Sequence, residues 1–357
     1  MSRYWSELAR GLSPYVPGEQ PQISGLVKLN TNESPFGPSP MAIEAVRLAA
    51  ADTLRLYPDP QSTRLREVLA EYHGVGPEQV FVGNGSDEVL AHAFSGLLKQ
   101  PKPVLFADVT YSFYPVYCGL LGIDHETVPL DGEMRIRIAD YFEGGGSIII
   151  ANPNAPTGIA LSRTEIEQLV SRRVDAPVVI DEAYVDFGAE SAIPLIRDHS
   201  NLLVVQTLSK SRALAGLRVG YAIGDRALIE ALTRVKDSFN SYPLGRPAQA
   251  GAIAAIQDEA YFQQKRSIII GNREGLTATL IQLGFDVLPS SANFVFARHP
   301  SHTGQALSAA LRDRAVLVRH FAGPRVSDFM RITIGSKAEL HRLTDALAEF
   351  LATPSPI

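Results

Sequence analysis

A lysine and an aspartate that each follow a run of apolar residues are the first candidates for chemistry. Lys210 lies just beyond the run Leu202–Val205, and Asp181 directly follows the run Val178–Ile180. A neutral lysine amine is a nucleophile, and a buried carboxylate must be paired or hydrogen-bonded to offset its loss of hydration. The functional interpretation is a nucleophilic amine with a carboxylate that pairs with a protonated ring nitrogen. The plainer alternatives are a solvated loop lysine and an aspartate that caps a helix or forms a structural ion pair.

A third segment has the features of a phosphate site. The apolar run Val80–Val82 is followed by Gly-Asn-Gly-Ser-Asp-Glu at 83–88, which opens a predicted helix. Two glycines permit a tight turn, Ser86 is the expected helix cap, and the free amides with the helix dipole suit a phosphate. For this segment alone, an ordinary serine-capped turn between a strand and a helix is the alternative.

The elements that must position these segments alternate between short apolar runs and amphipathic helical stretches. Runs that are apolar at nearly every position are typical of strands buried on both faces of a parallel sheet. The predicted strands are Val80–Val82, Val104–Ala107, Ile148–Ala151, Val178–Ile180 and Leu202–Val205, and the helices between them include Asp87–Leu98, Glu165–Arg172 and Ala227–Lys236. Ligands of open parallel sheets bind beyond the carboxyl ends of the strands, which is where all three candidate segments lie.

The chain divides into three expected regions. Residues 1–38 form an extended arm, because five prolines interrupt any helix and no strand alternation is sustained. Residues 39–245 form a large α/β domain with a mostly parallel sheet flanked by helices, and residues 246–357 form a smaller α+β domain that the arm joins.

Several elements outside the central alternation are predicted as well. A helix capped by Ser39 runs through Leu54, and a second runs from Ser62 to Tyr72 and is ended by Gly74. The smaller domain is expected to contain a long helical region at Pro247–Leu283, strands near Asn293–Ala297 and Met330–Ile334 with a helix between them, and a last helix at Lys337–Leu351.

Composition narrows the classes of partner. The 357 residues carry a net charge of −5, whereas a protein that binds the backbone of a nucleic acid needs a basic surface. This composition argues against a nucleic acid as partner. The single cysteine, Cys118, excludes an intrachain disulfide, and the eight histidines have no metal-ligand spacing. No signal peptide or membrane-spanning run is visible, so we expect a cytoplasmic protein without membrane or metal.

Together these segments resemble the aminotransferases of the aspartate aminotransferase superfold and, within them, the histidinol-phosphate aminotransferases. The resemblance covers essentially the whole chain. It rests on Leu12–Tyr15, Lys28–Glu33, Tyr57-Pro58, Gly85–Glu88, Asn152–Gly158, Asp181–Tyr184, Ser209-Lys210, Ala215–Arg218 and Met330–Gly335. The lysine segment and the Asp-Glu-Ala-Tyr segment, in this order and spacing, are highly specific.

The resemblance implies pyridoxal 5′-phosphate as cofactor and a role for each site residue. Lys210 holds the cofactor as a Schiff base and then acts as the base, while Asp181 keeps the pyridine nitrogen protonated. Tyr184 donates to the cofactor's phenolate oxygen. The remaining implied cofactor contacts are Tyr111, which stacks on the ring, and Ser86, Asp87, Thr207, Ser209 and Arg218, which surround the phosphate.

One position departs from the family pattern. Many members have an asparagine directly before Pro-Thr-Gly that also contacts the phenolate oxygen, but Ala155 stands there in this sequence. Either Asn154 or Asn152 supplies the contact through a shifted geometry, or Tyr184 acts alone. The alternative for both asparagines is turn chemistry beside proline.

The substrate is expected to bind through arginines, whose planar forks suit carboxylates and phosphates. The resemblance assigns Arg331 to a carboxylate and Arg319 to the phosphate of the substrate, with a surface ion pair as the alternative for Arg319. It also implies that Tyr15 closes the site from the arm. Tyr57 reaches the cofactor phosphate of a neighbouring chain in a homodimer. Arg325 is a further candidate cation for the substrate, but no sequence pattern supports it.

The implied activity is amino transfer between L-glutamate and imidazole-acetol phosphate in L-histidine biosynthesis. An aromatic amino acid aminotransferase and a threonine-phosphate decarboxylase of the same superfold are the alternatives. A regulator that binds pyridoxal phosphate without catalysis would need a DNA-binding module, for which no residues remain.

Overall fold

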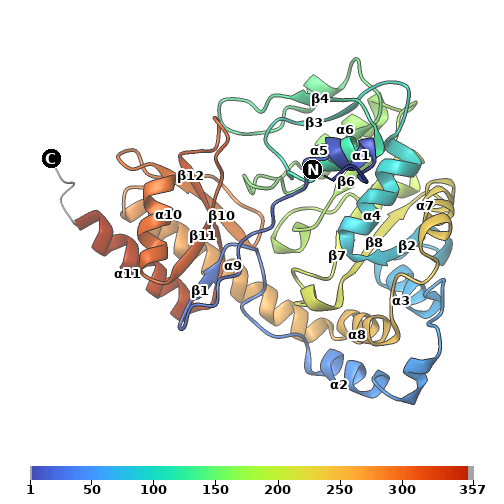
Figure 1. The fold of residues 1–357 in the computed structure, drawn as a ribbon, viewed down its shortest axis with the longest axis horizontal. Coiled ribbons are helices and arrows are strands. Elements are labelled where there is room, and N and C mark those ends of the chain that lie inside the picture. The colour runs from blue at the N-terminus through green and yellow to red at the C-terminus, as the bar shows by residue number, and fades with distance from the viewer. Residues whose placement is uncertain (1, 353–357) are drawn as a thin grey trace.

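The protein consists of two layered units, seen in a computed structural model that describes residues 2–352 (Figure 1). The larger unit contains a seven-stranded sheet in the order β2-β8-β7-β6-β5-β3-β4, and the smaller contains a five-stranded sheet in the order β1-β11-β12-β10-β9. This arrangement confirms the predicted fold class. Among residues 2–352, no helix has the length and apolar character needed to cross a membrane.

The strands of the large sheet correspond to the apolar runs. They are β2 (Val80–Asn84), β3 (Val104–Ala107), β4 (His125–Val128), β5 (Ile148–Ala151), β6 (Val178–Asp181), β7 (Leu202–Thr207) and β8 (Val219–Gly224). Every residue of β3, β5, β6, β7 and β8 is buried, because helices cover both faces. The sequence did not predict β4, an exposed edge strand, or β8, whose apolar residues are interrupted by glycine.

Strand direction explains why the three candidate segments meet. The strands β3 to β7 pair in parallel, whereas β8 is antiparallel to both β7 and β2. Two antiparallel steps make β2 parallel to β7, so the carboxyl ends of β2, β6 and β7 lie at the same edge of the sheet. The segment 83–88 and Asp181 lie at the ends of β2 and β6, and Lys210 lies just beyond the end of β7.

Two apolar clusters hold the helices on the sheet. On one face lie α2 (Pro40–Ala49), α3 (Thr63–His73), α6 (Arg163–Arg172) and α8 (Arg246–Gln257). On the other face lie α4 (Gly85–Ala93), the π-helical turn Phe94–Leu98, α5 (Tyr114–Leu121) and α7 (Arg226–Phe239). Ser39 caps α2 through the backbone N–H of Ala42, and α3 ends at Gly74 with φ +68°, as predicted.

Two helix ends differ from expectation. Helix α2 stops at Ala49, and the residues toward Leu54 form a separate 3₁₀ turn, Asp52–Arg55. The prediction that Ser86 caps a helix is wrong. Gly85, at φ +79°, is already the first residue of α4, so Ser86 lies inside its first turn.

The small unit combines chain segments from both ends of the sequence. Its strands are β1 (Val27–Leu29), β9 (Asp286–Val287), β10 (Phe294–Arg298), β11 (Val316–His320) and β12 (Phe329–Thr333), packed with α9 (Glu259–Gln282), α10 (Gly304–Asp313) and α11 (Lys337–Ala352). The arm therefore contributes a strand, since β1 pairs in parallel with β11. It also contains a short helix, α1 (Glu7–Gly11). Neither element was predicted, because three and five residues are too short to show a period.

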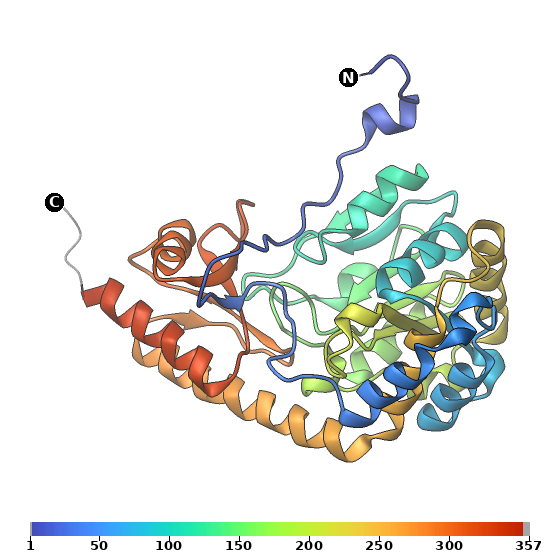
Figure 2. The same cartoon turned by 60° about the horizontal axis from the view of Figure 1, so that its bottom comes forward.

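A long helix joins the two units. Figure 2 shows α9 running along the base of the molecule from α8 into the small unit. Helix α8 begins at the expected boundary, residue 246, but packs against α2, where a Cβ on Gly251 would lie 2.7 Å from Val46. We therefore propose that the junction between the units lies within α9.

One glycine of the large sheet ties β8 to the turn that starts α4. A Cβ on Gly220 would lie 2.3 Å from the backbone nitrogen of Ser86 and 2.4 Å from the carbonyl carbon of Gly85. Because backbone atoms cannot swing aside, we expect Gly220→Ala to lower the free energy of unfolding by about 1–3 kcal/mol. Gly271→Ala is the matched control, since its Cβ meets nothing within 4 Å in helix α9.

Urea titration of both variants measures the effect. The control should be unchanged or more stable by about 0.5–1 kcal/mol, because alanine is a better helix former than glycine. Equal midpoints for Gly220→Ala and the unmutated protein would show that the turn has room to move.

Candidate active site

A cavity of about 480 Å³ lies at the carboxyl edge of the large sheet, against the small unit and the arm. Its wall contains every predicted site residue except Asn154 and Tyr57: Tyr15, Ser86, Asp87, Tyr111, Asp181, Tyr184, Thr207, Ser209, Lys210, Arg218, Arg319 and Arg331. These side chains come from both units, so the cavity exists only where the units meet.

Asp181 ends β6 and is nearly enclosed, with 5% of its surface exposed. Its Oδ2 accepts a hydrogen bond from the Tyr114 hydroxyl at 2.9 Å, and its Oδ1 accepts one from the backbone N–H of Ala183 at 3.2 Å. Burial raises the pKa of the Asp181 carboxyl to about 6, although the hydrogen bonds oppose this shift. Asp181 is therefore easier to protonate than an exposed aspartate, and a cationic partner in the cavity would stabilise its charged form.

Lys210 follows β7 and extends toward the arm. Its Nζ donates to the carbonyl oxygen of Thr31 at 3.3 Å and lies 5.9 Å from the centre of the Tyr184 ring. The side chain is therefore directed into the cavity, and the alternative of a solvated loop lysine does not hold. One cavity thus brings together an amine and a carboxylate from neighbouring strands.

The turn before α4 forms the end of the cavity that suits a phosphate. Arg218 pairs with Asp87 at 2.8 Å, and its Nη1 lies 3.5 Å from Ser209 Oγ. Gly85 has φ +79°, where other residues are strained, and a Cβ there would lie 2.4 Å from Arg218 Nη2, so the guanidinium would have to move. Thr207 also lines the cavity, but its hydroxyl is engaged with the backbone of Val219 and Ser209.

Two tyrosines form the side walls. The Tyr111 hydroxyl donates to Asp87 at 3.0 Å, and its ring meets Tyr114 edge to face at 5.6 Å. Tyr15 comes from the arm and packs against Phe113, with ring centres 4.9 Å apart. The arm therefore covers the cavity from the side of α5.

Arg319 and Arg331 are direct neighbours on the small sheet, where their Cα atoms are paired between β11 and β12. Arg331 Nη2 donates to the carbonyl of Asn30 at 3.0 Å, and Arg319 Nη2 donates to that of Val16 at 3.3 Å. Neither forms an ion pair among the described residues, and the buried Arg331 Nε has no hydrogen-bond partner there. Burial lowers the pKa of Arg331, and the charge of Arg319 adds to that effect. Two adjacent unpaired guanidinium groups favour binding of an anion.

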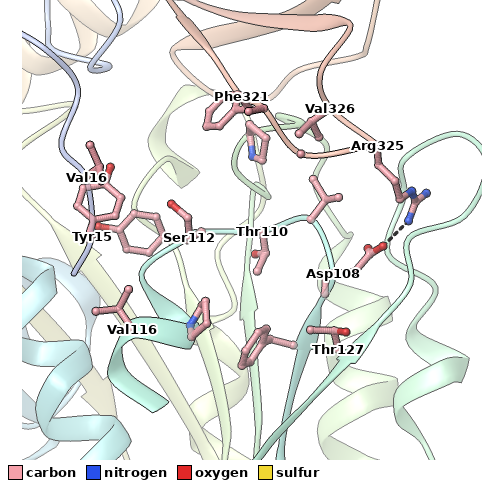
Figure 3. Close-up of a pocket in the computed structure, with 18 of the residues that line it drawn as sticks. Tyr15, Val16, Asp108, Thr110, Ser112, Val116, Thr127, Phe321, Arg325 and Val326 are labelled. Carbon is pink, nitrogen blue, oxygen red and sulfur yellow. Dashed lines mark hydrogen bonds and ion pairs between the residues drawn. The ribbon is translucent and has the colours of Figure 1, made fainter. Parts of the chain in front are cut away.

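A second cavity, of about 690 Å³, adjoins the first and shares Tyr15, Tyr111 and Arg319 with it. Figure 3 shows Tyr15 at one end of this adjoining cavity and the pair Arg325–Asp108 at the other. Arg325 is paired with Asp108 at 2.6 Å and bonds two backbone carbonyls, so it is not a free cation for a substrate.

Asn154 and Tyr57 lie outside the cavity, and so does Asn152, the alternative to Asn154. The Asn154 amide bonds Val109 and Thr110, and the Asn152 amide bonds the backbone of Leu161, so both asparagines hold turns, as in the alternative. Tyr57 is 77% exposed and stacks on Tyr242 with ring centres 4.7 Å apart.

Sequence reasoning missed Asn32, which lines the cavity and donates to the Tyr184 hydroxyl at 3.0 Å. The segment Lys28–Glu33 contributed to the resemblance, but its residues were assigned no role. The available signal was an Asn-Thr-Asn sequence directly after a short apolar run.

No group of three or more metal-ligating side chains is present in the described part of the chain, residues 2–352. The arrangement instead suits an organic cofactor with a phosphate and a basic ring nitrogen. An amine, a buried carboxylate and a helix start with free backbone amides all border one cavity of about 480 Å³.

Comparison with known proteins agrees with this geometry. Residues 24–347 match the family model of aminotransferase class I and II. The chain is 63% identical to histidinol-phosphate aminotransferase 1 of Bradyrhizobium diazoefficiens over 98% of its own length and 100% of that protein. It is also 63% identical to histidinol-phosphate aminotransferase 2 of Rhizobium meliloti, with the same coverage.

A solved structure shows the same fold. The histidinol-phosphate aminotransferase of Sinorhizobium meliloti, crystallised in complex with pyridoxal-5′-phosphate, matches with a TM-score of 0.88 and 25% identity over 98% of both chains. The chain belongs to the class I and II aminotransferases and, within them, to the histidinol-phosphate aminotransferase family.

Proposed function

We propose that this chain transfers an amino group between L-glutamate and imidazole-acetol phosphate in L-histidine biosynthesis, with pyridoxal 5′-phosphate as cofactor. The observation that carries the proposal is the unpaired couple Arg319 and Arg331 in the same cavity as Lys210 and Asp181. The names of its relatives support the choice of substrate over an aromatic amino acid or threonine phosphate.

Each residue near the proposed cofactor has a physical role. When bound, pyridoxal phosphate supplies a ring that takes up the electron pair left on the substrate carbon. Lys210 attaches the cofactor, and its freed amine then moves the proton between the substrate carbon and the cofactor's C4′. Asp181 holds the ring nitrogen protonated, and Tyr184 donates to the phenolate oxygen.

The phosphate of the cofactor is assigned to the start of α4. The amides of Ser86 and Asp87 point out of the first helical turn, where the helix dipole favours an anion. Ser209 adds a hydroxyl and Arg218 a charged fork, with Thr207 as a weaker neighbour. Tyr111 stacks on the ring. The position of each of these residues in the wall of the cavity supports the assignments.

The arginine pair accounts for two different substrates in one site. Glutamate has two carboxylates, whereas histidinol phosphate has a phosphate and no carboxylate. We assign Arg331 to the carboxylate of glutamate and Arg319 mainly to the phosphorylated substrate, with Tyr15 closing the cavity over both.

We further propose a homodimer that works in the cytoplasm. Helix α1 buries none of its residues on its own chain and projects from the body (Figure 2), and Tyr57 is exposed outside the cavity. A two-fold interface would give both features a partner and place Tyr57 at the neighbour's cofactor phosphate. The buried thiol of Cys118 is compatible with a reducing compartment.

The covalent link is tested first. Borohydride reduction of the loaded protein, followed by peptide mass analysis, should find a pyridoxyl adduct on Lys210, and Lys210→Ala should give none. Histidinol phosphate should convert the cofactor faster than phenylalanine, and threonine phosphate should release no carbon dioxide. An adduct on another lysine would overturn the assignment, and a preference for phenylalanine would change the substrate.

The arginine assignments are tested by separate half-reactions. Loss of a charge-assisted fork costs about 1.5–3 kcal/mol, or roughly ten- to a hundred-fold in the specificity constant. Arg319→Ala should impair the histidinol-phosphate half-reaction far more than the glutamate half-reaction, whereas Arg331→Ala should impair glutamate severely. Single-turnover absorbance of the cofactor measures each. Arg325→Ala is the control, because its ion pair with Asp108 predicts an effect on stability only. Equal losses in both half-reactions for Arg319→Ala would indicate a structural role.

Mixed dimers test the shared site. A purified hybrid of one Lys210→Ala chain and one Tyr57→Phe chain should contain one site with both substitutions and one site with neither. Such a hybrid should therefore keep about half of the unmutated activity. If Tyr57 acts within its own chain, the hybrid should instead keep half the activity of the Tyr57→Phe dimer. Tyr242→Phe, at the stacked neighbour, is the control substitution.

A further inference from the structure

Asn32 is fixed by the small unit at the wall of the cavity. It is 1% exposed and has φ +55°, a left-handed conformation that asparagine tolerates better than most residues. Its backbone N–H donates to Thr333 Oγ1 at 3.0 Å, and its carbonyl accepts from Asn293 Nδ2 at 3.0 Å. Both partners are themselves buried, so the position of Asn32 is set by the fold rather than by a ligand.

The same threonine orients the Asn32 side chain. Because the Thr333 hydroxyl accepts the backbone N–H, its own proton is free to be donated, and it is donated to Asn32 Oδ1 at 3.0 Å. With Oδ1 engaged in this way, the amide nitrogen Nδ2 is turned toward Tyr184 and donates to its hydroxyl at 3.0 Å.

The amide leaves one direction for the proton of Tyr184. A tyrosine hydroxyl has a single proton, and an NH₂ group cannot accept it. The ring packs with Ala155, Ala292 and Phe294, which are apolar, so that side offers no side-chain acceptor. The charged neighbours Lys210 and Arg331 are donors as well. The cavity is therefore the direction in which the Tyr184 hydroxyl can donate its proton.

We infer that Asn32 is a positioning residue that holds the Tyr184 hydroxyl as a donor to the phenolate oxygen of the bound cofactor. This inference rests on the proposed function and names a residue for it that the family pattern did not indicate. The side chain of Ala155 has no polar atom with which to contact that oxygen. Asn32, a residue of the arm held by Thr333 of the small unit, instead orients Tyr184, which makes the contact with that oxygen.

The test uses the pH at which the absorbance of the bound cofactor changes, measured without substrate. A hydrogen bond donated to the phenolate oxygen stabilises its negative charge. Loss of the donor therefore raises the pKa of the bound cofactor. Tyr184→Phe should therefore raise the midpoint by about one pH unit. Asn32→Gly removes the amide without straining the left-handed backbone, and Thr333→Val frees the amide to flip. Both should raise the midpoint in the same direction.

A double-mutant cycle separates orientation from a general disturbance. If Asn32 acts through Tyr184, then Asn32→Gly and Thr333→Val should cause no further shift in the Tyr184→Phe protein. Asn272→Ala is the matched control, because this buried side-chain amide of helix α9 donates to the carbonyl of Gly335 and does not line the cavity, so the midpoint should be unchanged. Thermal unfolding checks that each variant is folded, and if Asn32→Gly is not, Thr333→Val decides alone.

The outcomes distinguish the inference from the function on which it rests. No shift in either variant, or the same shift with and without Tyr184, would overturn the role of Asn32. A protein that binds no pyridoxal phosphate, or binds it without Lys210, would overturn the proposed function instead.

Discussion

Three consecutive residues of the N-terminal arm hold the two units in register at the cavity. The carbonyl of Asn30 accepts from Arg331, the carbonyl of Thr31 accepts from Lys210, and the amide of Asn32 donates to Tyr184. The arm itself is anchored because β1 pairs with β11. Lys210 and Tyr184 belong to the large unit and Arg331 to the small one, so two backbone carbonyls and one side-chain amide of the arm contact the amine, the phenol and the guanidinium together. The rest of the fold supplies rigid strands from which these side chains extend to the three residues of the arm.

The central part of the fold was predictable because strands that are buried on both faces of a sheet are apolar at nearly every position. The strands β3 and β5 are uniformly apolar, and β6 is apolar up to its last residue, Asp181. Asp181 and Lys210 stand at or just beyond the ends of such strands, which is why their types alone indicated a site. Short or exposed elements, such as β1 and β4, carry no comparable pattern and were missed.

The remaining parts of the site depend on contacts between residues far apart in the chain. Asn32 and Thr333 are separated by 301 positions, and nothing in either local sequence predicts that they meet. The same holds for Asn154, which the family pattern beside Ala155 suggested as a cofactor contact, whereas its amide donates to the carbonyl of Val109. Ser86 failed as a cap for a local reason, since a left-handed glycine starts the helix one residue earlier than a serine cap requires.

The cross-strand pairing of Arg319 and Arg331 sets selection for stability against selection for activity. Like charges placed opposite each other on adjacent strands destabilise a sheet, and here no carboxylate among the described residues compensates them. A neutral residue at position 319 would relieve that repulsion, yet it would also remove a cation proposed for a substrate; at position 331 it would in addition remove the hydrogen bond to the carbonyl of Asn30. Screens that reward thermal tolerance should therefore drift toward variants that have lost one of these arginines, and engineering for robustness has to hold both positions constant.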